Sequence, residues 1–211
     1  KELNLPNTFY FPFILGDGQP ATLHICRASG MTSLLKPSEF TTQKVFSDFE
    51  EYTEIVKKDP VETHRLDDID IDNLDLIKID VQGSELVILQ NGTQKLKDVV
   101  MIQTEVSFIP LYEDQPSFAT MDQFLRKQGF VPHCFAQIHR HPIHPCTNEK
   151  NIYNTNQVME ADIVYIPNFE RLSALSDEKL KHLALLAQAS YGSTDLALHC
   201  LIILQERGSI Q

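Results

Sequence analysis

The chain has 211 residues, of which 42% are hydrophobic and 22% charged, and this composition is typical of a folded globular protein with one well-buried core. Its 18 basic and 29 acidic residues give a net charge of −11, which argues against a nucleic-acid partner because such proteins usually present a basic patch. We therefore expect a small-molecule substrate or a protein partner.

The N-terminal part of the chain predicts a small β unit. Residues 8–15 and 21–27 have strand-like patterns, and the Gly-Asp-Gly sequence at 16–18 predicts the turn of a β-hairpin between them. Residues 51–66 are strand-like again. Pro60 lacks a backbone N–H, which places at least part of that strand at an edge or a bend.

Two later segments predict buried strands that each close on a carboxylate. Residues 75–81 lead to Asp80, and residues 99–106 lead to Glu105. Continuous apolar strands of this kind are typical of a parallel sheet with helices on both faces. Ligands bind such sheets at the carboxyl ends of the strands, so we expect Asp80 and Glu105 at the same edge.

Helices at 84–91 and 117–128 follow these strands, which predicts an α/β sheet with right-handed crossovers. Strands at 130–135 and 161–166 complete the pattern. The sheet is expected to be mostly parallel and to hold one layer of strands at 9–15, 76–81, 99–106, 130–135 and 161–166.

The segment between Asp80 and the first helix carries its own signals. Gly83 lets the backbone approach a ligand or a neighbouring loop. Glu85 complements the helix dipole in the first turn. Gln82 can orient Asp80 or a substrate, or contact the helix N-terminus. Asp80 is either a ligand-facing carboxylate or a strand-end cap, and its place in the sheet favours the first interpretation.

Residues 133–146 contain four histidines and two cysteines. Their spacing matches no structural zinc signature, so we predict no metal site there. An exposed polar loop is favoured over a lid in which a histidine such as His139 contacts the substrate.

The C-terminal residues predict a helical hairpin. Ser176 caps a helix that ends at Gly192, and a second helix covers about 194–207. The second helix is apolar on nearly every side and must be buried against something. Self-association through this hairpin is therefore expected.

The sequence favours a cytoplasmic protein. No apolar run approaches the roughly 18 residues of a membrane span, and the start of the chain has no signal-peptide pattern. Four cysteines without a recognisable spacing favour reduced thiols.

Four motifs follow one another along the middle of the chain: HRLDDI (64–69), LIKIDVQGSELVILQNG (76–92), VVMIQTEVSFIPLYEDQPSF (99–118) and FLRKQGF (124–130). In this order they closely resemble the FkbM-type family of S-adenosylmethionine-dependent methyltransferases. The resemblance covers roughly residues 8–135, with 161–166 as the final strand. It implies a Rossmann-like methyltransferase fold and O-methyl transfer, often to a sugar or secondary-metabolite hydroxyl, and hence a small-molecule or glycan substrate.

With this resemblance the candidate site comprises eight residues. The catalytic candidates are Asp80 and Glu105. The candidates for contact with S-adenosylmethionine are Asp80, Gln82, Gly83 and Asp17. The candidates for contact with the substrate are Glu85, Tyr112 and His139. Asp17 is also explained by turn chemistry alone, and Asp67 and Asp68 are favoured as capping residues.

Two family features are missing from the sequence. The family carries an Asp-x-Gly-Ala-x-x-Gly loop after its first strand and an acidic residue after its second, and neither is found here. We expect the chain to begin near the third strand of the fold and to bind S-adenosylmethionine poorly by itself. The expected division is a methyltransferase-like domain at 1–170 and a helical hairpin at 171–211.

Two other functions stay open at this point. The chain can be a binding or interaction module that has lost the cofactor half and works through its C-terminal helices. It can also be a different α/β enzyme that modifies a sugar or a nucleotide, although the order of the motifs fits this interpretation less well.

Overall fold

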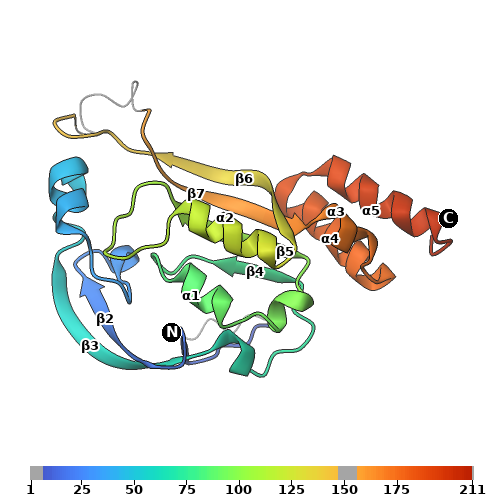
Figure 1. Ribbon diagram of the computed structural model, residues 1–211, viewed down its shortest axis with the longest axis horizontal. Coiled ribbons are helices and arrows are strands. Elements are labelled where there is room, and N and C mark those ends of the chain that lie inside the picture. Colours follow the sequence, from blue (N-terminus) through green and yellow to red (C-terminus); the bar gives the residue numbers. More distant parts are fainter. Residues whose placement is uncertain (1–6, 147–155, 211) are drawn as a thin grey trace.

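The computed structural model describes residues 7–146 and 156–210 and folds them into two β-sheets surrounded by helices (Figure 1). The strands are β1 (Ile14–Leu15), β2 (Pro20–Cys26), β3 (Ile55–His64), β4 (Leu76–Ile79), β5 (Met101–Ser107), β6 (Phe130–Arg140) and β7 (Val158–Pro167). The α-helices are α1 (Glu85–Gln90), α2 (Phe118–Lys127), α3 (Phe169–Ser173), α4 (Asp177–Tyr191) and α5 (Thr194–Glu206). Short 3-10 or π-helical turns lie at Ser29–Met31, Thr41–Val45, Ser47–Phe49, Leu66–Asp68 and Lys95–Lys97. Within these described residues, none of the helices has both the length and the hydropathy that crossing a membrane requires.

β4, β5, β7 and β6 form the four-stranded sheet, in this order. β4 pairs in parallel with β5, whereas β7 runs antiparallel to both β5 and β6. The prediction of a mostly parallel sheet is therefore not confirmed, because the pairing is mixed. β7 follows β6 along the chain and lies beside it, and neighbouring strands joined in this way need no crossover helix when they run antiparallel.

β1, β3 and β2 form a separate three-stranded sheet. The predicted hairpin between 8–15 and 21–27 is wrong, because β2 pairs antiparallel with one side of β3 and β1 pairs in parallel with the other. Thr63 of β3 helps to set this arrangement: its Oγ1 accepts a hydrogen bond from the Gly18 N–H at 3.0 Å. The turn at 16–18 thus carries the chain from β1 on one side of β3 to β2 on its other side. Residues 9–15 consequently lie outside the four-stranded sheet, contrary to the expected single layer.

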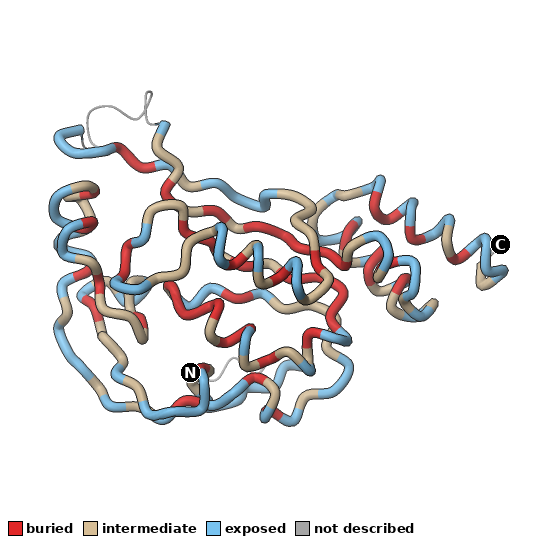
Figure 2. Tube along the Cα trace, viewed as in Figure 1, coloured by how far each residue is buried: buried red, intermediate tan, exposed pale blue. Residues whose placement is uncertain are grey.

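Helices cover both faces of the four-stranded sheet, and buried residues concentrate along β5 and β7 (Figure 2). α1 and α2 pack on one face, in the same cluster as Ile102. α4 and α5 pack on the other face, against Met101 and Val164. Because side chains alternate along a strand, Glu105 lies on the same face as Met101, and Asp162 on the same face as Val164. The second face is therefore apolar beside α4 and α5 and acidic further along the strands.

β6 takes up most of the histidine-rich segment. It runs to Arg140 instead of ending at residue 135, with three shifts of register against β7. Such bulges let a strand bend and continue where regular pairing fails. The predicted strand at 130–135 is therefore confirmed, and the predicted loop is wrong for residues 136–140. His133 is a strand residue whose Nε2 lies 2.7 Å from the Ser193 hydroxyl at the start of α5.

The C-terminal residues form the predicted pair of helices. The Ser176 hydroxyl accepts a hydrogen bond from the Lys179 N–H at 3.3 Å, and Gly192 ends α4 with a left-handed φ of 63°. In α5, Leu196 is 4% exposed while Leu198 is 48% exposed. The hairpin thus buries one stripe of α5 and leaves another apolar stripe at the surface.

Candidate functional site

A tight turn joins β4 to α1 and positions the first functional side chains. Gln82 and Gly83 have positive φ angles of 59° and 103°, so two successive residues adopt left-handed backbone. Glu85 fastens the turn from inside, because its Oε1 accepts hydrogen bonds from the N–H groups of Val81 at 2.9 Å and Gly83 at 3.1 Å. The Ser33 hydroxyl donates to the Gln82 carbonyl at 2.7 Å and ties the turn to the N-terminal segment.

Three carboxylates meet at this turn, and we call Asp80, Glu85 and Glu105 the acidic cluster. One carboxylate oxygen from each lies within 4.8 Å of the other two. The register of β4 and β5 explains the meeting: Ile79 pairs with Thr104, so the next residue of each strand lies on the same face. Asp80 and Glu105 therefore lie together as predicted, although β5 continues past Glu105 to Ser107.

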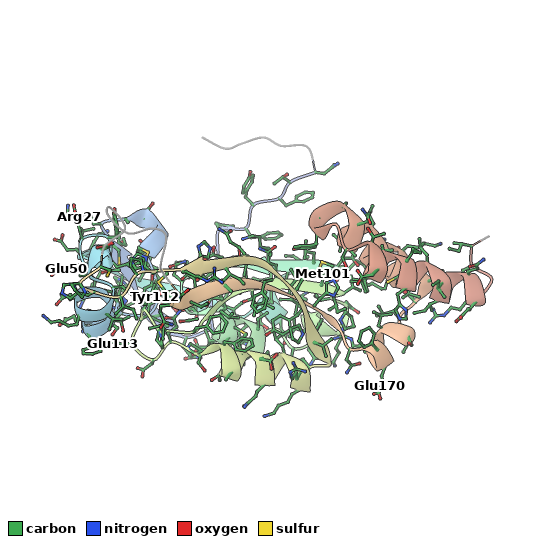
Figure 3. All side chains as sticks on the ribbon, turned by 90° about the horizontal axis from the view of Figure 1, so that it is seen from above. Arg27, Glu50, Met101, Tyr112, Glu113 and Glu170 are labelled. Carbon is green, nitrogen blue, oxygen red and sulfur yellow. The ribbon has the colours of Figure 1, made fainter. Side chains whose placement is uncertain are left out.

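Gln82 bridges two members of the acidic cluster. Its Nε2 donates to Asp80 Oδ1 at 3.0 Å and to Glu105 Oε2 at 3.4 Å. The Tyr112 hydroxyl lies 3.0 Å from Gln82 Oε1 and 3.1 Å from the Met31 carbonyl oxygen, and its single hydrogen is shared between these two acceptors, which orients the amide. Tyr112 lies at the end of the sheet nearest the N-terminal segments, far from α4 and α5 (Figure 3). It is 2% exposed, so its hydroxyl reaches the acidic cluster through Gln82.

Burial and crowding of like charges dominate the electrostatics here. Burial raises the pKa of Glu105 to about 9, and the nearby negative charges of Glu160, Asp80, Glu85 and Asp162 add to this shift. Burial also raises the pKa of Glu85, against the opposing effect of the backbone N–H donors that it accepts from. Burial likewise raises the pKa of Glu160. The site therefore favours any ligand that brings positive charge.

Sequence reasoning missed Glu160 and Asp162. Both lie on β7, where Asp162 pairs with Glu105 and Glu160 pairs with Ser107. The signal was present as two acidic residues separated by one position in an otherwise apolar strand. Its meaning depends on β7 pairing with β5, which the local pattern does not reveal.

The remaining predicted residues lie around or away from the acidic cluster. His139 on β6 pairs with Glu160 on β7, and this neighbour partly opposes the rise that burial causes in the pKa of Glu160. Asp17 belongs to its own turn, where its Oδ1 accepts from the Gln19 N–H at 2.9 Å. None of the described hydrogen bonds joins Asp17 to the acidic cluster.

Asp67 is a capping residue, but it caps the distant turn at Lys95–Lys97, and the turn at Leu66–Asp68 has no side-chain cap. Its Oδ1 accepts hydrogen bonds from the N–H groups of Gln94 and Lys95, both at 3.0 Å.

Two hollows lie close to these residues. An apolar hollow of about 360 Å³ borders the turn on one side, lined by Phe13, Leu15, Leu23, Leu34, Val81 and Ser84. A more polar one of about 430 Å³ lies beside Asp162, lined also by Gln103, Cys134, Phe135, Gln137 and Tyr191. A roomier hollow of about 730 Å³, formed by residues between Lys36 and Ile55, shares no residue with the acidic cluster. We place the site at the acidic cluster because its groups converge there.

Comparison with known protein families gives one match: a model of the methyltransferase FkbM domain aligns with residues 2–132. This range contains the whole β4–α1 turn, Glu105 and Tyr112, and it ends before His139, Glu160 and Asp162. No curated protein and no solved structure matches the chain significantly.

Proposed function

Because the chain belongs to the FkbM methyltransferase family, we propose that it transfers a methyl group from S-adenosylmethionine to a hydroxyl oxygen of a sugar or secondary metabolite. The observation that supports this proposal best is the convergence of Asp80, Glu105 and Gln82 at the carboxyl ends of two parallel strands. Open α/β sheets bind their ligands at this edge.

The residues present fit part of this cofactor. S-adenosylmethionine supplies a methyl group bound to a positively charged sulfur. The acidic cluster offers negative charge for that end, and the apolar hollow beside Val81 suits a flat ring such as adenine. In this proposal Asp80 and the Gln82–Gly83 backbone contact the cofactor, and the role of Asp17 stays a prediction.

Asp80 is the group that we propose to contact the reacting hydroxyl. It is exposed, it follows the end of β4, and its Oδ1 accepts a hydrogen bond from Gln82 Nε2. A carboxylate in this place can orient the hydroxyl and accept its proton. Glu105 is less exposed than Asp80, and its Oε2 accepts a second hydrogen bond from Gln82 Nε2, which fixes the position of the amide. Glu85 and Tyr112 are buried, so they support the turn and the amide, while His139 is left to contact the acceptor.

The test is transfer of a labelled methyl group. The full-length gene product is incubated with methyl-labelled S-adenosylmethionine and a panel of sugars and hydroxylated metabolites. We expect at least one acceptor to gain one methyl group on oxygen, and the same acceptor with that hydroxyl already methylated to gain none. Transfer to nitrogen or carbon instead would contradict the proposed chemistry.

We also propose that the chain self-associates through its C-terminal helices. α4 and α5 form an apolar groove of about 380 Å³ that includes Leu185, Leu198 and Leu201, and Leu185 is 68% exposed. Exposed apolar patches of this kind commonly mark interfaces.

We further propose that the protein is located in the cytoplasm. Its four cysteines are all free, which supports this location.

Sedimentation and light scattering are expected to show a dimer of the 24.1 kDa chain that dissociates on dilution. Replacing Leu198 and Leu201 by Lys places charge in the groove without touching the buried stripe, and should leave a folded monomer. Gln205→Lys, on the exposed part of the same helix, is the matched control and should still dimerise. A monomeric wild-type chain at high concentration would contradict this interface.

A further inference from the structure

The acidic cluster lacks a compensating basic side chain. In the described part of the chain, no Lys or Arg forms an ion pair with Asp80, Glu85 or Glu105, although seven ion pairs of Lys or Arg with other carboxylates are found there. Glu160 adds a further carboxyl on the same face of the sheet. Ionised carboxylates this close repel one another, and the repulsion is relieved either by a proton on one of them or by a cation between them.

The spacing of the three carboxylates suits a metal ion with oxygen ligands. Oxygens bound to one cation lie at most about 4 Å apart around Mg²⁺ and about 5 Å apart around Ca²⁺, given their usual bond lengths. The oxygens of the acidic cluster lie within 4.8 Å of one another. Asp80 is exposed while Glu85 is buried, so a cation can enter past Asp80 and be held from behind.

A second, independent feature is the hydroxyl of Ser107. This side chain is 5% exposed, and among the described residues its Oγ has no hydrogen-bond partner. Ser107 lies two positions beyond Glu105 on the same face of β5 and directly opposite Glu160. Buried hydroxyls normally have a partner, and a water bound to a cation in the acidic cluster would provide one.

Gln82 can adapt to a cation without losing Tyr112. In the present orientation Nε2 faces Asp80 and Glu105, and Oε1 accepts from Tyr112. Turning the amide by half a rotation points Oε1 at the acidic cluster, where it becomes a further oxygen ligand. Nε2 then donates to the Tyr112 hydroxyl, which still donates to the Met31 carbonyl.

We propose that the acidic cluster binds one divalent cation through carboxylate oxygens of Asp80, Glu85 and Glu105, with Gln82 Oε1 completing the set. This differs from the sequence-based expectation of no metal. Binding itself does not depend on the proposed methyl transfer. If that function holds, which this step rests on, one Asp80 oxygen would hold the cation, the cation would contact the acceptor hydroxyl and ease loss of its proton, and the other Asp80 oxygen would remain to accept that proton.

Terbium luminescence tests the site directly. Tb³⁺ replaces Ca²⁺ at oxygen sites, and the chain contains no Trp, so emission excited through tyrosine reports an ion near a tyrosine such as Tyr112. We expect saturable, one-site emission that Ca²⁺ displaces. Asp80→Asn and Glu105→Gln should each weaken Tb³⁺ binding at least about 10-fold, because each removes a charged ligand. Gln82→Glu adds a carboxylate and should strengthen binding several-fold.

Glu51→Gln is the control for charge alone, since Glu51 lines the separate acidic hollow at 36–55. Its Tb³⁺ affinity should stay within about twofold of the wild type, and circular dichroism should confirm that all variants are folded. Unchanged affinity in both Asp80→Asn and Glu105→Gln, or an equal loss in Glu51→Gln, would overturn the proposal. Because no methyl donor or acceptor is present, the result is independent of the methyl-transfer assay.

Discussion

Asp80→Asn is expected to lower the kcat of methyl transfer at least about 100-fold, the usual range for loss of a positioned proton acceptor, while the fold is kept. Asn has the same shape, and its side-chain oxygen can still accept the hydrogen bond that Gln82 donates. Asp80 is exposed, so no buried partner is left unpaired. The free energy of unfolding should therefore change by less than about 0.5 kcal/mol.

Asp72→Asn is the matched control for this prediction. Asp72 is also exposed, lies eight positions earlier in the chain, and takes no part in the contacts of the acidic cluster. Its kcat should equal that of the wild type. Labelled-methyl kinetics give kcat and KM for all three proteins, and thermal unfolding gives their stability. Wild-type turnover in Asp80→Asn would mean that Asp80 is a strand-end cap and nothing more.

Gly83→Ala is expected to destabilise the protein by about 3 kcal/mol. Its φ of 103° is strained for any residue with a side chain, which costs about 1–3 kcal/mol. The added Cβ would also lie 3.0 Å from Leu35 Cδ1 and 3.2 Å from Gln115 Cγ, so these neighbours must shift. The melting temperature should fall by about 6–12 °C for a chain of this size.

Gly30→Ala provides the comparison, because a Cβ at Gly30 meets no atom within 4 Å and its φ is not left-handed. That variant should melt within about 2 °C of the wild type, consistent with a surface change below 0.5 kcal/mol. An equal melting temperature for Gly83→Ala and the wild type would show that the turn relaxes freely and that its geometry is not set by glycine.

The central strands and helices could be read from the sequence because their signals are local. An apolar run that ends at Asp80 or Glu105 and precedes a helix shows which end of the strand is its carboxyl end. When two such strands are parallel neighbours, both carboxylates lie at the same edge of the sheet. The caps at Ser176 and Gly192 are local in the same sense. The model of the FkbM domain also aligns with the part of the chain that contains Asp80 and Glu105.

The errors lie where the partner of a strand decides the outcome. Strands β2 and β6 have patterns that fit several neighbours, so the pairing of β2 with β3 and the extension of β6 to Arg140 depend on contacts that are distant in sequence. The same cause hid Glu160 and Asp162, whose meaning appears once β7 is placed beside β5. The role of Tyr112 depends on its burial behind Gln82.

Gln82 is held by two segments that are distant from it in the chain, Ser33 on one side and Tyr112 on the other. The Ser33 contact requires the N-terminal segment to have docked, and the Tyr112 contact requires the loop after β5 to have docked. Contacts between distant segments form late, because closing the intervening loops costs entropy first. Local opening of either segment releases the amide while the apolar core stays closed. Under the proposed function, methyl transfer would therefore report that folding is complete, and a molecule with an intact core but a loosened N-terminal segment would be inactive.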